Sequence, residues 1–260
     1  MANTIDWGKA SVNNTIDYGQ GAIDNTINWG KSQTLSPSGE TNITGTPSTP
    51  PFINTKSIAL DGVDDFVAIS ANSNLQISDT FTISQWVKFT STSQMYVTNF
   101  ANKFGVYVQN GFVYLVFRNL SNSQITLQSA STINDGNYHN VTVVKTSSTM
   151  AIYIDGTLNA SNTNGSLGIT SALSNAIGSL FNGAIPFNGT IDEVAIWNND
   201  QSANASAIGS TIPTDLSTYN PLSWWRCGDG DSAPILSDNG SGGNDGTMVF
   251  FNTFSTDVPT

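Results

Sequence analysis

Hydrophobic and polar positions alternate with the two-residue period of β-strands along most of residues 57–198. In FTISQWVKF (81–89), the four apolar residues at odd positions fall on one face of the predicted strand, and Trp86 falls on the other. Three further segments carry short apolar patterns and are also expected to be strands: DFVAIS (65–70), NAIGSLF (175–181) and GTIDEVAIW (189–197). The pattern predicts a chain built from many short strands.

Tight turns separate the predicted strands. In GVYVQNGFVYLVF (105–117), Asn110-Gly111 lies between two apolar runs, and Asn-Gly is the strongest short signal for a hairpin. Residues 138–161 predict another strand pair, which includes a second tight turn at Asp155-Gly156. A helix of one or two turns is expected only within 202–210. Many strands broken by Gly, Asn and Asp favour an antiparallel sandwich.

The composition agrees with this pattern and narrows the possible partners. Charged residues make up 10% of the chain, which is low for a soluble domain, and Asn, Ser, Thr and Gly supply the polar character. The net charge of −11 and the absence of a basic cluster argue against nucleic acid as a partner. Cys227 is the only cysteine, so an intrachain disulfide is excluded.

The sequence also bears on where the protein is made. The opening residues MANTIDWGKA lack the basic and apolar regions of a signal peptide. No apolar run approaches the roughly 20 residues of a membrane helix, so membrane insertion is not expected. We therefore expect synthesis in a cytoplasm without export by the Sec route.

Three copies of a short aromatic phrase open the chain: NTIDWGK (3–9), NTIDYGQ (14–20) and NTINWGK (25–31). Asn, Thr and Gly in every copy disfavour a helix, so each copy is expected to be a short extended piece. Three such pieces cannot bury a core alone. We expect residues 1–31 to be an anchor that docks on a larger assembly or on symmetry-related copies, and a disordered arm is the alternative.

The remaining chain divides by composition into three parts. Residues 32–56 hold four of the nine prolines among Ser, Thr and Gly, which is typical of a linker. Residues 57–215 contain the predicted strands. Residues 216–260 are expected to be an extension that completes the sandwich.

Four phrases carry a resemblance to a known family. They occur in family order: SIALDGVDDFVAI (57–69), FTISQWVKF (81–89), DGNYHNVTVVKTSSTMAIYIDGTL (135–158) and FNGTIDEVAIWN (187–198). Over about residues 57–200 the chain resembles the laminin-G-like, concanavalin A-type lectin/glucanase superfamily. The resemblance implies an all-β fold, an antiparallel jelly-roll β-sandwich. It also implies binding of glycans or proteins, and many such domains hold a structural Ca²⁺.

The C-terminal segment LSWWRCGDGDSAPILSDNGSGGNDGTM (222–248) resembles the phrase that usually opens such a domain. The first and last strands of an antiparallel sandwich commonly lie side by side. Strands near residues 223–226 and 247–251 are therefore expected to complete the sandwich, either in the same chain or in a neighbouring copy. A loose tail is the alternative, but it would expose several large aromatic side chains.

No catalytic pattern is visible, so an enzyme is not expected. Glucanases on this scaffold use carboxylates that alternate along one strand. Here Asp192 and Glu193 are neighbours and are expected to point to opposite faces. His139 has no suitable nucleophile nearby in sequence and is expected to be a hydrogen-bonded strand residue. Cys227 is expected to be a small buried residue.

A calcium site is one interpretation of the acidic residues. LDGVDD supplies Asp61, Asp64 and Asp65 on a turn, and the resemblance implies that the aspartate of the IDEV strand can approach that turn. The expected ligands are Asp61, Asp64 and Asp192, because Ca²⁺ takes oxygen ligands. The alternative is that these acids accept backbone N–H bonds within turns. The loop DNGSGGNDG (238–246) lacks the final Glu of an EF-hand and is not expected to bind calcium.

A glycan site would need an exposed aromatic residue beside amides or acids. Composition alone does not place one, because aromatic residues on strands more often belong to the core. The tyrosines that qualify by composition are Tyr96, Tyr107, Tyr114, Tyr138 and Tyr153.

The repeats and the C-terminal segment also resemble structural proteins of phages, especially marine phages. We therefore expect a virion structural protein of a fibre, tail or capsid surface, made in the host cytoplasm. It is expected to assemble with other virion proteins and with its own copies through residues 1–31, and to adhere to a cell-surface glycan. The alternatives are a free carbohydrate-binding module, which has no use for the repeats, and a glycoside hydrolase, which the carboxylate pattern disfavours.

Overall fold

The computed structural model describes residues 26–28, 32–34, 52–75, 77, 79–100, 103–119, 121–163 and 175–260. The chain divides into two compact units, residues 1–51 and 52–260. In the first unit, β1 (Thr26–Asn28) pairs antiparallel with β2 (Ser32–Thr34). β1 belongs to the third repeat, and the first two repeats lie outside the described residues. The anchor role of residues 1–31 stays a prediction.

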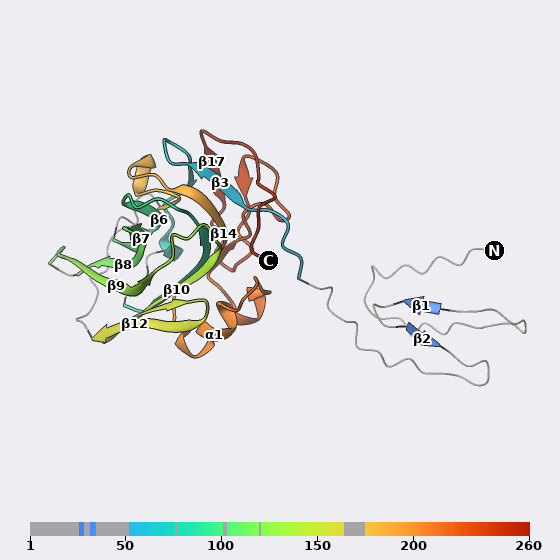
Figure 1. Ribbon diagram of the computed structural model, residues 1–260, viewed down its shortest axis with the longest axis horizontal. Coiled ribbons are helices and arrows are strands. Elements are labelled where there is room, and N and C mark those ends of the chain that lie inside the picture. Colours follow the sequence, from blue (N-terminus) through green and yellow to red (C-terminus); the bar gives the residue numbers. More distant parts are fainter. Residues whose placement is uncertain are drawn as a thin grey trace, which may run out of the picture. The chain divides into compact units, whose positions relative to one another are not determined.

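Residues 52–260 form a sandwich of two stacked antiparallel sheets (Figure 1). The seven-stranded sheet has the order β12-β11-β10-β5-β14-β15, and β3 also pairs with β14. Its strands are β3 (Ile58–Asp61), β5 (Phe81–Lys88), β10 (His139–Lys145), β11 (Thr149–Ile154), β12 (Thr157–Thr163), β14 (Asn188–Trp197) and β15 (Ser223–Trp225).

The second sheet has eight strands in the order β16-β17-β4-β13-β6-β7-β8-β9. Its strands are β4 (Phe66–Ile69), β6 (Met95–Phe100), β7 (Phe104–Gln109), β8 (Phe112–Arg118), β9 (Gln124–Thr132), β13 (Asn175–Ile177), β16 (Ile235–Leu236) and β17 (Gly246–Val249). The predicted all-β sandwich is confirmed.

Helices are few and short in the described part of the chain. The one α-helix is α1 (Ala205–Ile208), inside the predicted range. The 3-10 turns are Ser73–Leu75, Phe181–Gly183, Ser202–Asn204 and Leu216–Tyr219. None of these described helices has the length and apolar character needed to span a membrane.

The inner faces of the two sheets enclose one hydrophobic core. The four apolar residues at odd positions of 81–89 belong to this core, while Trp86 is buried outside it, so the predicted alternation is confirmed. Both predicted tight turns are also present. Asn110 and Gly111 have φ of 52° and 80°, and Asp155 and Gly156 have φ of 49° and 70°, as a two-residue hairpin turn with two left-handed positions requires.

The C-terminal residues contribute β15 to the seven-stranded sheet and β16 and β17 to the eight-stranded sheet of the same chain. β15 pairs with β14, so that Trp224 lies opposite Ala195. β17 pairs with β4, so that Met248 lies opposite Val67. Within the WWRC phrase the side chains alternate, because Trp225 and Cys227 enter the core and Trp224 packs on the outer face. Strands from the beginning and from the end of 52–260 therefore lie in the same two sheets.

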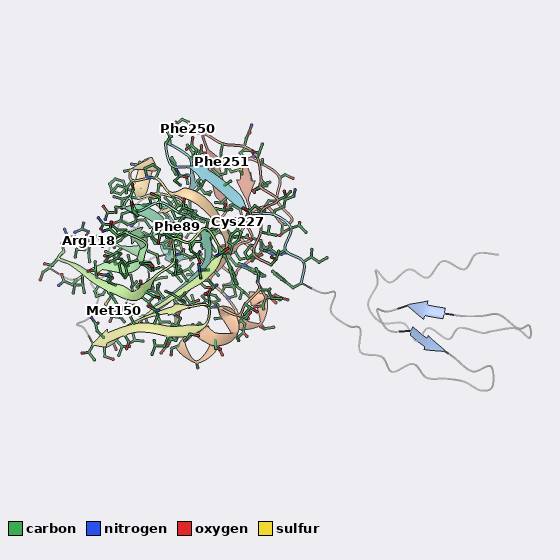
Figure 2. All side chains as sticks on the ribbon, viewed as in Figure 1. Phe89, Arg118, Met150, Cys227, Phe250 and Phe251 are labelled. Carbon is green, nitrogen blue, oxygen red and sulfur yellow. The ribbon has the colours of Figure 1, made fainter. Side chains whose placement is uncertain are left out.

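The aromatic residues after β17 differ from one another. Phe251 packs against the core, but Phe250 is 74% exposed. Its φ of 67° ends the strand and turns the side chain outward, at the edge of the sandwich in Figure 2. The C-terminal segment therefore completes the sandwich and still leaves one of its large aromatic side chains, Phe250, exposed.

The polar loop 238–246 is held by its own aspartates. Asp238 accepts hydrogen bonds from the backbone N–H groups of Trp224, Gly240 and Asn244. Asp245 accepts one from the N–H of Asp238. The acids in this loop hold the backbone in place, as short polar side chains commonly do in turns.

Candidate functional site

The turn after β3 gathers three acidic side chains. Carboxylate oxygens of Asp61, Asp64 and Asp65 lie within 4.8 Å of one another. Asp61 also accepts the backbone N–H of Val63 at 2.8 Å, and Asp65 accepts that of Asp61 at 3.3 Å. Burial raises the pKa of Asp65, and the neighbouring negative charges add to that effect. The turn thus uses its acids for backbone bonds and also presents oxygen ligands of the kind that Ca²⁺ takes.

Asp192, the third expected ligand, lies outside this cluster. β14 meets β3 at Asn188, which stands opposite Asp61, and Asp192 is four residues further along β14. At the rise of a strand this is about 13 Å. Asp192 is fully buried, and its Oδ2 accepts a hydrogen bond from Asn54 Nδ2 at 2.8 Å. The structure thus brings Asp61 and Asp64 together with Asp65 and leaves Asp192 apart.

Calcium binding stays a prediction, and its expected effect is to stabilise the folded protein. In metal-free buffer, calcium at about 100 times its Kd is expected to add roughly 2.7 kcal/mol to the free energy of unfolding. The double substitution of Asp61 and Asp64 by Asn should abolish the increase in melting temperature, whereas Asp200→Asn, on a distant turn, should keep it. If neither calcium nor EDTA changes the melting temperature, the proposed calcium site is wrong.

The acid pair of β14 corrects one expectation. Glu193 has a left-handed φ of 47°, and the pairing of β14 with β5 shifts register between Asp192 and Ala195. This is a β-bulge, in which an extra residue interrupts the alternation of side chains. Asp192 stands opposite Trp86, and Glu193 Oε2 accepts the indole N–H of Trp224 at 2.6 Å. Because both tryptophans pack outside the main core, the expectation that the two carboxylates point to opposite faces is wrong.

Both carboxyl groups are buried and have partners in the chain. Burial raises the pKa of Asp192 well above its usual value and that of Glu193 to about 7. Arg226 opposes the effect on Glu193, because its Nε donates to Glu193 Oε1 at 3.2 Å. The Arg226 guanidinium also lies 4.4 Å from the ring centre of Phe52. These contacts tie the segment around residues 52–54 to β14 and β15.

His139 and Cys227 occupy the positions expected of structural residues. His139 Nδ1 lies 2.8 Å from Asp155 Oδ2, and Nε2 lies 3.3 Å from Asp135 Oδ1. The hydrogen bond to Asp155 is the main cause that raises the pKa of His139. Cys227 is fully buried inside the sandwich (Figure 2), and burial raises the pKa of its thiol. The hydrogen-bonded imidazole and the small buried residue are both confirmed.

Three tyrosines line up across the outer face of the eight-stranded sheet. Tyr96 of β6 stands opposite Tyr107 of β7, which stands opposite Tyr114 of β8. Their ring centres are 5.4 and 4.6 Å apart, and the rings of Tyr107 and Tyr114 are nearly parallel, at 3°. Together with Val116 they form a cluster separate from the core, which we call the tyrosine face. Burial raises the pKa of Tyr107 to about 12, so this phenol stays neutral near pH 7.

A bulge in β6 brings Asn99 to the same face. The pairing with β7 shifts register between Tyr96 and Thr98, so that Tyr96 faces Tyr107 and Asn99 faces Gly105. In a regular strand, residues three positions apart point to opposite faces. Gly105 is needed at this point, because a side chain there would collide with the Thr98 carbonyl. The bulge therefore places an amide next to the tyrosine row.

A pocket of about 140 Å³ opens beside the tyrosine face. Asn99 is only 3% exposed there, and its Oδ1 has no hydrogen-bond partner among the described residues. A buried acceptor without a partner costs about 1–3 kcal/mol, so a hydrogen-bond donor beyond the described residues would stabilise Asn99. Aromatic rings beside a few polar groups are typical of ligand sites. The residues around the pocket include Tyr96, Asn99, Lys103, Arg118, Gln124 and Leu180.

The other two tyrosines that qualified by composition lie elsewhere. Tyr138 donates its hydroxyl hydrogen to the Asp257 carbonyl at 2.6 Å, which is a structural contact near the C-terminus. Tyr153 lies on β11 and lines a wider hollow of about 330 Å³ along the seven-stranded sheet. The structure therefore joins three of the five tyrosines in one row and separates the other two.

Comparisons with known proteins agree with the fold. The family model of the concanavalin A-like lectin/glucanases superfamily matches residues 61–205. No curated protein sequence matches the chain. A candidate carbohydrate-binding protein from Bacteroides ovatus has a similar structure, with a TM-score of 0.63 and 14% identity. That alignment covers 88% of this chain and 68% of the other.

Two further structures resemble the chain at lower scores. The CBM40 module of the Ruminococcus gnavus IT-sialidase, bound to α2,3-sialyllactose, has a TM-score of 0.47 and 17% identity, over 60% of this chain and all of that module. The receptor-binding domain of a botulinum neurotoxin C/D mosaic has a TM-score of 0.44 and 14% identity, over 59% of this chain and 45% of that domain. Because the family model covers more than half of the sequence and the strands form two stacked antiparallel sheets, the chain belongs to the concanavalin A-like lectin/glucanase superfamily.

Proposed function

We propose that residues 52–260 bind a carbohydrate through the tyrosine face and the pocket beside it. The observation that carries this proposal is Asn99, which lines the pocket next to Tyr96 and whose buried Oδ1 has no donor among the described residues. A sugar hydroxyl is a donor of the right kind. The fold, shared with a candidate carbohydrate-binding protein, supports the same function by analogy.

The parts of the site have separate tasks. Tyr114 is half-buried at the end of the row, and the residue opposite it on β9 is the exposed Gln128. A ring that is partly open can pack against the apolar C–H groups of a sugar, while the amides of Gln124 and Gln128 can bond its hydroxyls. Asn99 then accepts a hydroxyl hydrogen in the pocket.

Substitution of Tyr114 by Ala tests the site. We expect affinity for a bound glycan to fall roughly three- to tenfold, as the loss of one aromatic contact implies. Tyr153→Ala is the matched control, because Tyr153 is also a half-buried strand tyrosine but lies on the other sheet. Isothermal titration calorimetry measures both, with circular dichroism to check folding. The proposal fails if Tyr114→Ala keeps full affinity or if Tyr153→Ala loses it.

We propose binding without catalysis. The acid pair Asp192 and Glu193 is occupied by Asn54, Trp224 and Arg226, which supports a structural role. A reducing-sugar assay on polysaccharides should therefore show no release. Turnover that Glu193→Gln abolishes would overturn this part of the proposal and favour a glycoside hydrolase.

We further propose that the chain is a surface component of a phage virion that displays the sandwich for adhesion to host glycans. Two features support it. The aromatic repeats of residues 1–31 suit attachment to a larger particle, and a free carbohydrate-binding module would have no use for them. β15 and β17 pair within their own chain, so the sandwich does not need a neighbour to complete its sheets. Residues 1–31, which precede the sandwich, would then mediate assembly.

Removal of residues 1–31 tests the anchor. We expect the full chain to self-associate and the shortened chain to be a folded monomer, because the aromatic residues of the repeats can be buried only against another surface. A full-length variant with Trp7, Tyr18 and Trp29 changed to Ser should behave like the deletion. Light scattering measures the mass of all three proteins. An oligomeric state that is the same in all of them would count against the anchor.

A further inference from the structure

Two of the eight basic residues of this acidic chain lie in one pocket. The chain carries 19 acidic residues, yet Lys103 and Arg118 both line the pocket beside the tyrosine face. Arg118 is the last residue of β8 and lies at the rim of the sandwich in Figure 2. Lys103 directly precedes β7. Antiparallel pairing of β7 with β8 brings these two strand ends together, so the two positive charges share one site.

Neither cation is neutralised by an acid in the described part of the chain. Lys103 Nζ donates to Asn122 Oδ1 at 2.7 Å, and Arg118 Nη1 donates to the Asn122 carbonyl oxygen at 3.3 Å. Both acceptors are neutral, so they position the side chains and leave the charges uncompensated. By contrast, Lys88 pairs with Asp257 at 2.7 Å and Arg226 with Glu193 at 3.2 Å.

The wall of the pocket adds no negative charge. None of the described residues that line it is Asp or Glu. Its other polar members are the amides of Asn99 and Gln124 and the hydroxyl of Tyr96, and Asn99 Oδ1 lacks a donor from the described chain. The pocket thus offers two positive charges, one buried acceptor and an aromatic wall. An anionic group would satisfy the charges, and a hydroxyl on the same molecule would satisfy Asn99.

We propose that the pocket takes an acidic saccharide, in which Lys103 and Arg118 bind a carboxylate or sulfate group. Asn99 and the tyrosine face hold the uncharged part of the same sugar or of its neighbour. This inference rests on the proposed carbohydrate binding and adds the class of ligand. A guanidinium and an ammonium group form charge-assisted hydrogen bonds with carboxylate and sulfate oxygens. In a chain with a net charge of −11, this pair of uncompensated positive charges is a local exception that an anionic group can approach.

The first experiment compares charged and neutral forms of the same sugars. The probes are an oligogalacturonate and its methyl ester, and a sulfated N-acetyllactosamine and its unsulfated form, titrated into the full chain by calorimetry. The charged member of at least one pair should bind about tenfold or more tightly at low ionic strength, as a charge-assisted bond of about 1.5–3 kcal/mol implies. This preference should shrink as salt is raised towards 1 M, while binding of the neutral member should change little.

Variants assign the preference to the pocket. Arg118→Gln and Lys103→Gln should each reduce the advantage of the charged sugar and leave the affinity for its neutral form unchanged. Lys88→Gln makes the same change in net charge on the other sheet and should keep the preference. Tyr114→Ala should weaken both forms alike. The comparison of the two pairs separates carboxylate from sulfate recognition.

The two proposals fail in different ways. Equal affinity for the charged and neutral forms, with both weakened by Tyr114→Ala, would overturn the acidic class and keep carbohydrate binding. A preference that Lys88→Gln removes as strongly as Arg118→Gln would also overturn it. If Tyr114→Ala leaves the affinity for every probe unchanged, or if no probe binds, both proposals are wrong.

Discussion

A chain truncated after Pro221 is expected to aggregate instead of folding as a monomer. The truncation removes β15, β16 and β17 and leaves β14 and β4 without the partners that cover their edges. It also removes Trp225, which is fully buried, stacks on Phe100 at 6.3 Å between ring centres and donates its indole N–H to the Asn244 carbonyl at 2.8 Å. Unpaired strand edges beside an open apolar core promote association between chains.

Point substitutions test the packing of individual side chains in the C-terminal segment without removing its strands. Trp225→Ala is expected to lower the free energy of unfolding by about 3–5 kcal/mol, as for other large buried aromatic residues. Phe250→Ala in the same segment should change it by less than about 0.5 kcal/mol, because Phe250 is exposed. Urea denaturation followed by tryptophan fluorescence or circular dichroism measures both. A truncated chain that stays soluble with an unchanged midpoint would show that the C-terminal strands are dispensable.

The second large effect concerns pH. The folded protein is expected to be more stable at pH 5 than at pH 8, because Glu193 binds a proton more tightly when it is buried than when the chain is unfolded. Its pKa rises from 4.5 to about 7 on folding. The stabilisation is full below about pH 4.5 and is lost as pH rises through about 7. A change of this size corresponds to roughly 3 kcal/mol, and Asp192, whose pKa is also raised by burial, acts in the same direction.

Variants identify the groups responsible. Glu193→Gln and Asp192→Asn should each flatten the decline in stability between pH 5 and pH 8. His139 needs its own control, His139→Gln, because its raised pKa also gives stability that is lost as pH rises. Urea midpoints at a series of pH values measure the slope for each protein. Stability that stays level or rises from pH 5 to pH 8 in the unsubstituted protein would show that folding does not raise the pKa of these carboxyl groups as expected.

Alternation and turn residues predicted the strands of this protein well where one face is buried and the turn is short. The hairpin at Asn110-Gly111 and the strand at 81–89 are examples. β6 escaped prediction because all six of its residues are buried, and β9 because most of its residues are polar and exposed. In both strands, pairing within the sheet outweighs the local pattern.

The candidate site could not be predicted from the sequence, because it also depends on how strands pair. The tyrosine face depends on the register of β6, β7 and β8, and the place of Asn99 depends on the bulge after Tyr96. The bulge at Glu193 likewise overturned a prediction based on regular alternation. A bulge is set by how two strands fit together, so a single strand's residues do not reveal it. Lys103 and Arg118 are 15 positions apart, and only the hairpin makes them neighbours.

The pairing of β4 with β17 has a consequence for synthesis of the chain. Val67 emerges from the ribosome roughly 180 residues before its partner Met248. At about 5–20 residues per second this is a delay on the order of 10–40 seconds. Closing so long a segment is slow because the entropy of loop closure opposes it until the final contacts form. During that delay the nascent chain presents one edge of β4 unpaired, and this edge is open to pairing with strands of other chains.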